Sequence, residues 1–260
     1  MGGSGTVDDF RVRDLLSRSI SLSYGNARDF LVMAAVVGLP QFVAMILTIF
    51  MEPDFEKAMK DPKQGILGLI IWLLLIATCV LLVKYLGALP ALAANKEAGR
   101  KLEWTESLAW ARDQNLFWGV LGTVLLMLLA VLGGLILLIV PGVIGGVWFL
   151  LALPARVLGG HGAVESLRVS RGLIRPVFRK ALGLGAVLVA VMFLPSLIVE
   201  IVSWIAWGFA SRTPAHFILS GVVTYLAVIL WSPVAGVGIT LLYLERTGGI
   251  KNVRREVFLP

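Results

Sequence analysis

The sequence has few of the residues that build catalytic and metal centres. Its 260 residues include one cysteine and two histidines. A single thiol, Cys79, cannot form an internal disulfide or a cysteine-based metal site, so we expect a packing role for it. His161 and His216 stand far apart without a carboxylate cluster, and we therefore expect no metal and no cofactor. No Ser/His/Asp set, carboxylate pair or nucleotide loop is recognisable, so we expect the chain not to be an enzyme.

Charge is scarce as well, because long apolar runs occupy most of the chain. Charged residues make up 15% of the sequence, against roughly 25% in a soluble domain. Runs of about 20 uncharged residues can cross a hydrocarbon core about 30 Å thick as helices that rise about 1.5 Å per residue. We expect six crossings, at 30–51, 66–89, 116–140, 142–158, 180–199 and 216–244. Pro141-Gly142 separates the third run from the fourth and predicts a tight hairpin there.

Lysine and arginine are distributed unevenly among the segments between these runs. Of the 23 basic residues, 19 lie in four segments: 1–30, 84–115, 154–180 and the tail after Leu244. Six crossings would place those four segments and both termini on one side, and the positive-inside rule makes that side cytoplasmic. The net charge of +7 then needs no nucleic-acid partner, since topology and anionic lipid headgroups account for it.

One passage of the chain occurs twice. The strings "ALPA" at 88–91 and "ESLAWAR" at 106–112 return as "ALPA" at 152–155 and "ESLRVSR" at 165–171. In each copy we predict that a crossing ends at "ALPA", that a loop follows, and that Glu-Ser begins an amphipathic helix in the membrane interface. In the second copy Leu167, Val169, Leu173, Ile174 and Val177 fall on one half of the helical wheel, opposite Arg168, Arg171 and Arg175. Pro176 predicts the turn into the next crossing.

A weaker third copy opens the chain, where Val12, Leu15, Leu16 and Ile20 recur at helical spacing. The chain is therefore predicted to contain three repeats, at about 10–91, 104–158 and 164–245, between a flexible tail at 1–9 and a cytoplasmic tail at 246–260. The expected fold class is an all-α integral membrane protein with six transmembrane helices in three parallel hairpins. Each hairpin is preceded by a cytoplasmic interfacial amphipathic helix, around a pseudo-threefold axis along the membrane normal.

The segment 137–175, "LLIVPGVIGGVWFLLALPARVLGGHGAVESLRVSRGLIR", resembles the signature of a large prokaryotic family of six-crossing proteins. That family includes the membrane domain of glycerophosphoryl diester phosphodiesterase and related domains of unknown function. The matching residues are Pro141-Gly142, Leu153-Pro154, Gly162, Ser166-Leu167, Ser170 and Leu173. The resemblance implies a multi-pass protein of the bacterial inner membrane. The sequence departs from the family pattern at Gly159, where the family has an acid. No catalytic phosphodiesterase domain lies in these residues, so diesterase activity is not expected.

Two groups of residues are candidates for a site. Arg168, Arg171, Arg175, Arg179 and Lys180 could contact anionic lipid headgroups, although ordinary positive-inside bias would also explain them. Glu200 is an acid inside a long apolar stretch, and about 20 residues from Lys180 it should reach the outer interface, near Trp204 and Trp207. The alternative is a Glu200 that lines a cavity or pathway beside Pro195 and Pro233.

Small residues predict where helices approach closely. Gly142 and Gly146 form a G-x-x-x-G pair, which predicts packing between the third and fourth crossings. The stretch "SPVAGVG" at 232–238 is a candidate for a broken helix. Together these patterns favour a non-enzymatic membrane module, lipid-contacting or accessory to another protein. The alternative is a small transporter or channel for a solute or lipid along the bundle axis.

Overall fold

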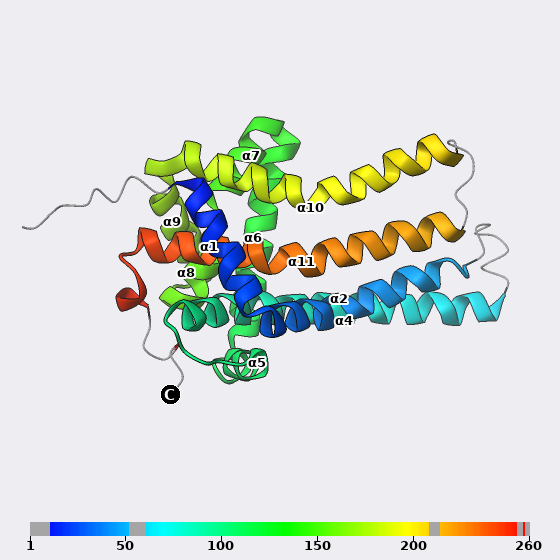
Figure 1. The fold of residues 1–260 in the computed structure, drawn as a ribbon, viewed down its shortest axis with the longest axis horizontal. Helices are drawn as coiled ribbons and strands as arrows, with labels where there is room; N and C mark the ends of the chain where they lie inside the picture. The colour runs from blue at the N-terminus through cyan, green and yellow to red at the C-terminus, as the bar shows by residue number, and fades with distance from the viewer. Residues whose placement is uncertain (1–10, 52–60, 208–213, 254–256, 258–260) are drawn as a thin grey trace, which may run out of the picture. The chain divides into compact units, whose positions relative to one another are not determined.

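The computed structural model describes residues 11–51, 61–207, 214–253 and 257, and all the regular structure within them is helical (Figure 1). The chain contains both long and short helices. They are α1 Val12–Gly25, α2 Ala27–Thr48, α4 Pro62–Glu97, α5 Trp104–Asp113, α6 Leu116–Leu137, α7 Ile139–Trp148, α8 Ala152–Gly159, α9 Ala163–Ile174, η1 Arg175–Val177, α10 Phe178–Trp207, α11 Pro214–Arg246 and η2 Ile250–Asn252.

Five segments in the described part of the chain are long and apolar enough to cross a membrane. They are Ala27–Thr48, Pro62–Glu97, Leu116–Leu137, Ile139–Gly159 and Ile218–Arg246. The remaining predicted run, 180–199, lies within the 30-residue helix α10. Exposed apolar side chains line these helices, for example Ile66, Trp72 and Leu73 on α4, as expected of helices solvated by lipid. The chain is thus an all-helical polytopic membrane protein.

Three boundaries predicted from proline and glycine are wrong. Helix α4 does not end at "ALPA" but continues through Pro90 to Glu97, and the second "ALPA" begins helix α8. The turn between α6 and α7 falls at the extended residue Leu138, so that Pro141 lies in the first turn of α7, where a missing N–H is tolerated. Helix α11 is continuous through Pro233. In membrane helices neighbouring groups satisfy the carbonyls that an internal proline leaves free.

The first compact unit consists of Met1–Phe30, Val83–Leu188 and Pro233–Pro260. It contains all three short helices that the repeats predict: α1, α5 and α9. Each helix carries an acid at its third position, and buried residues at its fourth and eighth positions. The acids are Asp14, Glu106 and Glu165, and the buried pairs are Leu15 and Ser19, Ser107 and Ala111, and Ser166 and Ser170. An acid in the first turn stabilises the positive end of the helix dipole.

Each of these short helices contacts a helix of another repeat. Ser107 Oγ on α5 donates a hydrogen bond to Ala88 O of α4, at 2.8 Å. Ser170 Oγ on α9 donates to Trp148 O of α7, at 2.7 Å. On α1, Ser19 Oγ would lie 3.0 Å from a Cβ placed on Gly238 of α11. The first repeat thus contacts the last long helix through α1, as the second and third repeats contact their predecessors through α5 and α9.

The end of the chain also packs into the first compact unit. Gly248 and Gly249 have positive φ and turn the chain after α11. Asn95 Nδ2 then donates to Val257 O at 2.9 Å, and the Val257 side chain is buried. The segment predicted as a tail at 246–260 is therefore held against α4 in its described part.

The second compact unit consists of Leu31–Leu82 and Val189–Ser232. Within it α2 packs against α11 through Tyr225, whose ring stacks on Phe42 with centroids 4.6 Å apart. The Tyr225 hydroxyl donates to Ala35 O at 3.0 Å. Gly38 makes room for the same ring, because a Cβ there would lie 2.9 Å from Tyr225 Cε2.

Candidate functional site

An arginine stripe runs from α9 through η1 into α10. Arg168, Arg171, Arg175 and Arg179 follow one another at helical spacing, and the side chains of all four are exposed. The 3₁₀ turn η1, which contains Pro176, joins the two helices without interrupting the helical backbone conformation at Arg175 and Phe178. Lys180, the fifth predicted cation, is half-buried. We call Arg168, Arg171, Arg175 and Arg179 the arginine face.

The arginine face is fixed to the membrane-embedded part of the chain at its centre. The guanidinium carbon of Arg171 lies 4.3 Å from the centroid of the Trp148 ring, at the end of α7. One residue earlier, Ser170 Oγ donates to Trp148 O at 2.7 Å and accepts from Leu151 N at 3.0 Å. Ser170 therefore satisfies two backbone groups at the break between α7 and α8, which apolar surroundings would otherwise leave unpaired.

The buried side of α9 differs from the side that its apolar residues predict. Ser166, Ser170 and Ile174 are buried, whereas Leu167 and Leu173 are half-buried. Small hydroxyl side chains let α9 approach its neighbours and bond their backbone. Of the apolar half predicted to enter the membrane, Ile174 and Val177 are buried in the protein, whereas Leu167, Val169 and Leu173 are half-buried beside the buried serines.

Two other cations of the first compact unit, Arg18 and Lys96, are neutralised by carboxylates within the protein. Arg18 on α1 hydrogen-bonds Glu97 at 2.6 Å and also Glu245. Burial alone would lower the pKa of Arg18, but hydrogen bonds and attraction from both carboxylates outweigh it and raise the pKa. Lys96 Nζ lies 2.6 Å from Asp29 Oδ2, and both side chains are largely buried. These ion pairs join α1 to α4 and α11, and α4 to the start of α2, and their cations are neutralised by the carboxylates.

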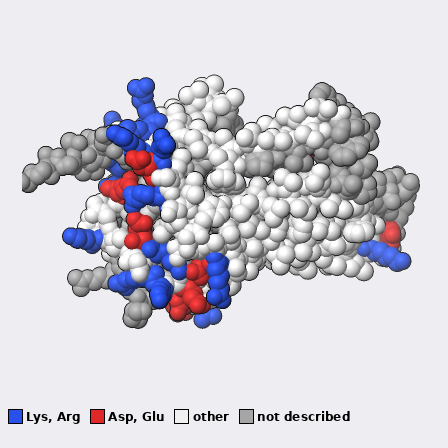
Figure 2. Space-filling view, in the orientation of Figure 1, with Lys and Arg blue, Asp and Glu red and all other residues white. Residues whose placement is uncertain are grey.

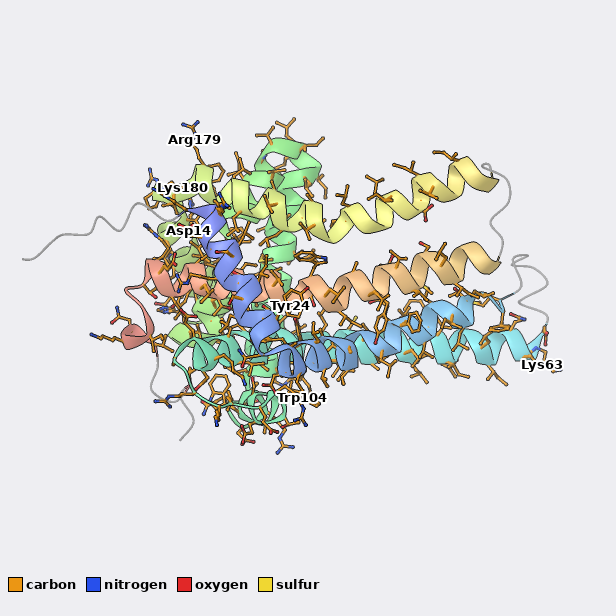
Figure 3. All side chains as sticks on the ribbon, viewed as in Figure 1. Asp14, Tyr24, Lys63, Trp104, Arg179 and Lys180 are labelled. Carbon is orange, nitrogen blue, oxygen red and sulfur yellow. The ribbon has the colours of Figure 1, made fainter. Side chains whose placement is uncertain are left out.

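The arginine face has no such compensation. Among the described residues, no ion pair involves any of its four arginines. Figure 2 shows lysine and arginine gathered over the first compact unit, which holds every described lysine and arginine except Lys63. In Figure 3 the side chain of Arg179 points away from the ribbon. The face therefore presents unpaired guanidinium groups, which match phosphate oxygens in geometry and charge.

Arg156 is a further cation that the sequence patterns did not single out. It lies on α8 and packs over Gly119 of α6, where an added Cβ would come within 1.9 Å of Nη2. Its Nη1 donates to His161 O, and its buried Nε has no hydrogen-bond partner among the described residues. The first "ALPA" is followed by the buried Leu92 at the matching position. An arginine in the second copy where the first copy has a leucine is the feature of the sequence that could have identified Arg156.

The other predicted site residues are not brought into the arginine face. Glu200 is exposed on α10 in the second compact unit. Pro195 lies within α10, outside the residues whose side chains are described, and Pro233 is buried in α11. Gly142 contacts α6, but a Cβ on Gly146 would meet nothing within 4 Å. The close approach is between Gly142 and Gly134, where a Cβ on Gly134 would lie 2.9 Å from Gly142 Cα.

No protein-family model, curated protein or solved structure matches this chain. In the described part of the chain, no group of three or more histidine, cysteine, aspartate or glutamate side chains is placed to hold a metal ion. The site is accordingly defined by its own geometry, as a stripe of exposed cations at the edge of a membrane-embedded helical bundle.

Proposed function

We propose that this chain is a non-enzymatic membrane protein whose arginine face binds anionic lipid headgroups. The observation that carries the proposal is the contrast between two sets of cations. Arg18 and Lys96 have carboxylate partners, whereas the four arginines of the arginine face have none among the described residues. A solvent-exposed cation near an anionic bilayer surface contributes about 1 kcal/mol of attraction.

The proposal includes the orientation in the membrane that the sequence predicts. Both termini and the arginine face lie on the cytoplasmic side of a bacterial inner membrane, where arginine and lysine accumulate. The three repeats are arranged in a ring, each begun by an interfacial helix. The contacts of α5 with α4, of α9 with α7 and of α1 with α11 support this arrangement. Such a module would act as a lipid-contacting or accessory component of the membrane.

The experiment measures lipid selectivity after reconstitution. Spin-labelled phosphatidylglycerol and phosphatidylcholine are compared for the fraction of each that is immobilised by the protein. In the variant Arg168→Gln/Arg171→Gln/Arg175→Gln we expect the preference for phosphatidylglycerol to fall by more than about tenfold, since three cations at about 1 kcal/mol each contribute about 3 kcal/mol.

A matched control removes the same number of charges elsewhere in the first compact unit. Arg13, Lys101 and Lys251 are exposed, so the triple glutamine variant at these positions should fold normally. We expect it to keep most of the preference. Equal losses in both variants would indicate a general charge effect and would contradict a site at the arginine face.

A further inference from the structure

The hairpin of α6 and α7 has an entirely apolar turn. Between Thr123 and Arg156 no side chain carries a charge, hydroxyl or amide. The segments that follow α2 and α10 in sequence, 52–64 and 211–216, both contain charged residues. A turn that reaches the outer water needs polar residues, and this one has none. Its five central side chains are nevertheless highly exposed: Ile136 85%, Leu137 78%, Leu138 68%, Ile139 73% and Val140 66%.

The returning limb is too short to come back from the far side of a membrane. Helix α7 has ten residues, from Ile139 to Trp148, and so is about 15 Å long. At its end the Trp148 ring already lies 4.3 Å from the guanidinium carbon of Arg171. Because the exposed Arg171 belongs at the level of headgroups and water, the tip lies at most about 15 Å from that level. The hydrocarbon core is about 30 Å thick.

The directions of the helices agree with this length. Within the first compact unit, α6 and α7 run across the direction of the first part of α10 and the last part of α11 (Figure 1). Both limbs also contact α9, the helix that begins the arginine face.

The backbone of the turn suits an apolar environment. Leu138 N donates to Gly134 O at 2.9 Å, which closes the end of α6. Pro141 has no N–H to satisfy, and the close contact of Gly134 with Gly142 keeps the two limbs together. Few polar backbone groups are therefore left at the tip, as burial in hydrocarbon requires.

We propose that α6 and α7 form a hairpin that does not cross the membrane. It lies along the plane of the bilayer, and its tip contacts the acyl chains of the leaflet that carries the arginine face. Apolar composition made this segment resemble two crossings, but its contacts place both limbs near one surface. Such a hairpin occupies area in one leaflet only. The inference rests on the chain's being membrane-embedded, as proposed above, and not on any preference of the arginine face for anionic lipid.

Depth measurements along two matched helices test the proposal. In a Cys79→Ala background, single cysteines replace Trp118, Leu125 and Leu132 on α6, which are exposed and seven residues apart. The control series on α4 is Ile66, Leu73 and Val80, with the same spacing and also exposed. Each cysteine carries bimane in phosphatidylcholine vesicles that contain doxyl lipids quenching at shallow or deep positions. Fourteen residues of helix span about 21 Å.

We expect the three α6 labels to share one depth, while the α4 labels differ in depth as a crossing helix requires. Depths that vary along α6 as they do along α4 would overturn the proposal. A second measurement uses Leu138→Cys with a membrane-impermeant maleimide, which we expect not to react from either face. Reaction from the face that labels Lys63→Cys would show a crossing, and reaction from the face that labels Arg100→Cys would place the tip in water. Neutral vesicles make these depths independent of headgroup charge, so failure of the lipid-selectivity experiment would leave this result unaffected.

Discussion

The guanidinium group of Arg171 lies over the ring of Trp148, 4.3 Å from its centroid. This contact joins the last residue of an apolar helix to the middle of the arginine face. An aromatic ring under a cation holds it by electrostatic attraction and restricts its rotamers, without neutralising its charge as a carboxylate would. Arg171 is thus positioned and still available to a phosphate.

Replacement of Trp148 by leucine should therefore weaken lipid selectivity while leaving the net charge unchanged. A cation–π contact at a partly exposed site is worth about 0.5–1 kcal/mol, so we expect roughly a two- to fivefold smaller preference for phosphatidylglycerol in the spin-label assay. Trp72→Leu is the control, because Trp72 is exposed on α4. An equal loss in both variants would mean that Trp148 acts only as an apolar residue.

Ser170→Ala should destabilise the protein more than an average serine substitution. It removes the donor to Trp148 O and the acceptor for Leu151 N, and leaves both backbone groups unpaired at a buried helix break. Each unsatisfied buried group costs about 1–3 kcal/mol. Thermal unfolding in detergent should show a lower Tm than for Ser17→Ala, whose exposed hydroxyl bonds only Asp14 O. A Tm equal to that of the control would show that water replaces the lost partner.

The length of the apolar runs predicted the long helices, and the repeated Glu-Ser strings predicted α5 and α9. Glu106 and Glu165 both occupy the third position of their helices, as a carboxylate attracted to the helix dipole should. These features are local, since composition and the first helical turn decide them. The same local information could also place Arg168, Arg171 and Arg175 together on one face.

Contacts between distant segments explain what the sequence did not predict. "ALPA" was expected to end helices, but Ala88, Ala91, Ala152 and Ala155 are all buried, which indicates that small residues serve helix packing there. Likewise, the Gly142–Gly146 spacing did not identify Gly134, because the approach of Gly134 to Gly142 depends on the turn at Leu138. No pattern along the chain shows that Trp148 returns to the level of Arg171.

Gly134→Ala should disrupt the α6–α7 hairpin. The new Cβ would lie 2.9 Å from Gly142 Cα and 3.0 Å from the carbonyl carbon of Pro141, which are backbone atoms that cannot move alone. Overpacking of this kind costs typically about 1–3 kcal/mol. Gly146→Ala is the matched control, since nothing lies within 4 Å of its Cβ and alanine favours helix. Differential scanning fluorimetry in detergent should rank Gly134→Ala below the wild type and Gly146→Ala at or above it; the reverse order would contradict the close approach.

Lys96→Met should destabilise the junction of α2 and α4. Lys96 and Asp29 side chains are 10% and 16% exposed, and the substitution leaves the Asp29 carboxylate with a single long hydrogen bond, from Trp104 N at 3.4 Å. We expect a loss of about 2 kcal/mol, in the range for hydrogen bonds to charged groups. Arg112→Met, which removes a mostly exposed pair with Asp113 at 3.6 Å, should cost less than about 0.5 kcal/mol. Adding Asp29→Asn should restore part of the loss in Lys96→Met, and a purely additive double variant would exclude coupling between the two groups.

Ionic strength should separate the arginine face from the internal ion pairs. The four arginines are exposed, so their attraction to anionic headgroups is screened when the Debye length falls from about 10 Å in 0.1 M salt to about 3 Å in 1 M salt. The Lys96–Asp29 pair is largely buried and is screened far less. We therefore expect the phosphatidylglycerol preference to decline steeply between 0.1 and 1 M NaCl while the Tm in neutral detergent changes little. A preference that persisted in 1 M salt would require direct, desolvated phosphate coordination, and the Arg171→Lys variant would then distinguish paired guanidinium hydrogen bonds from charge alone.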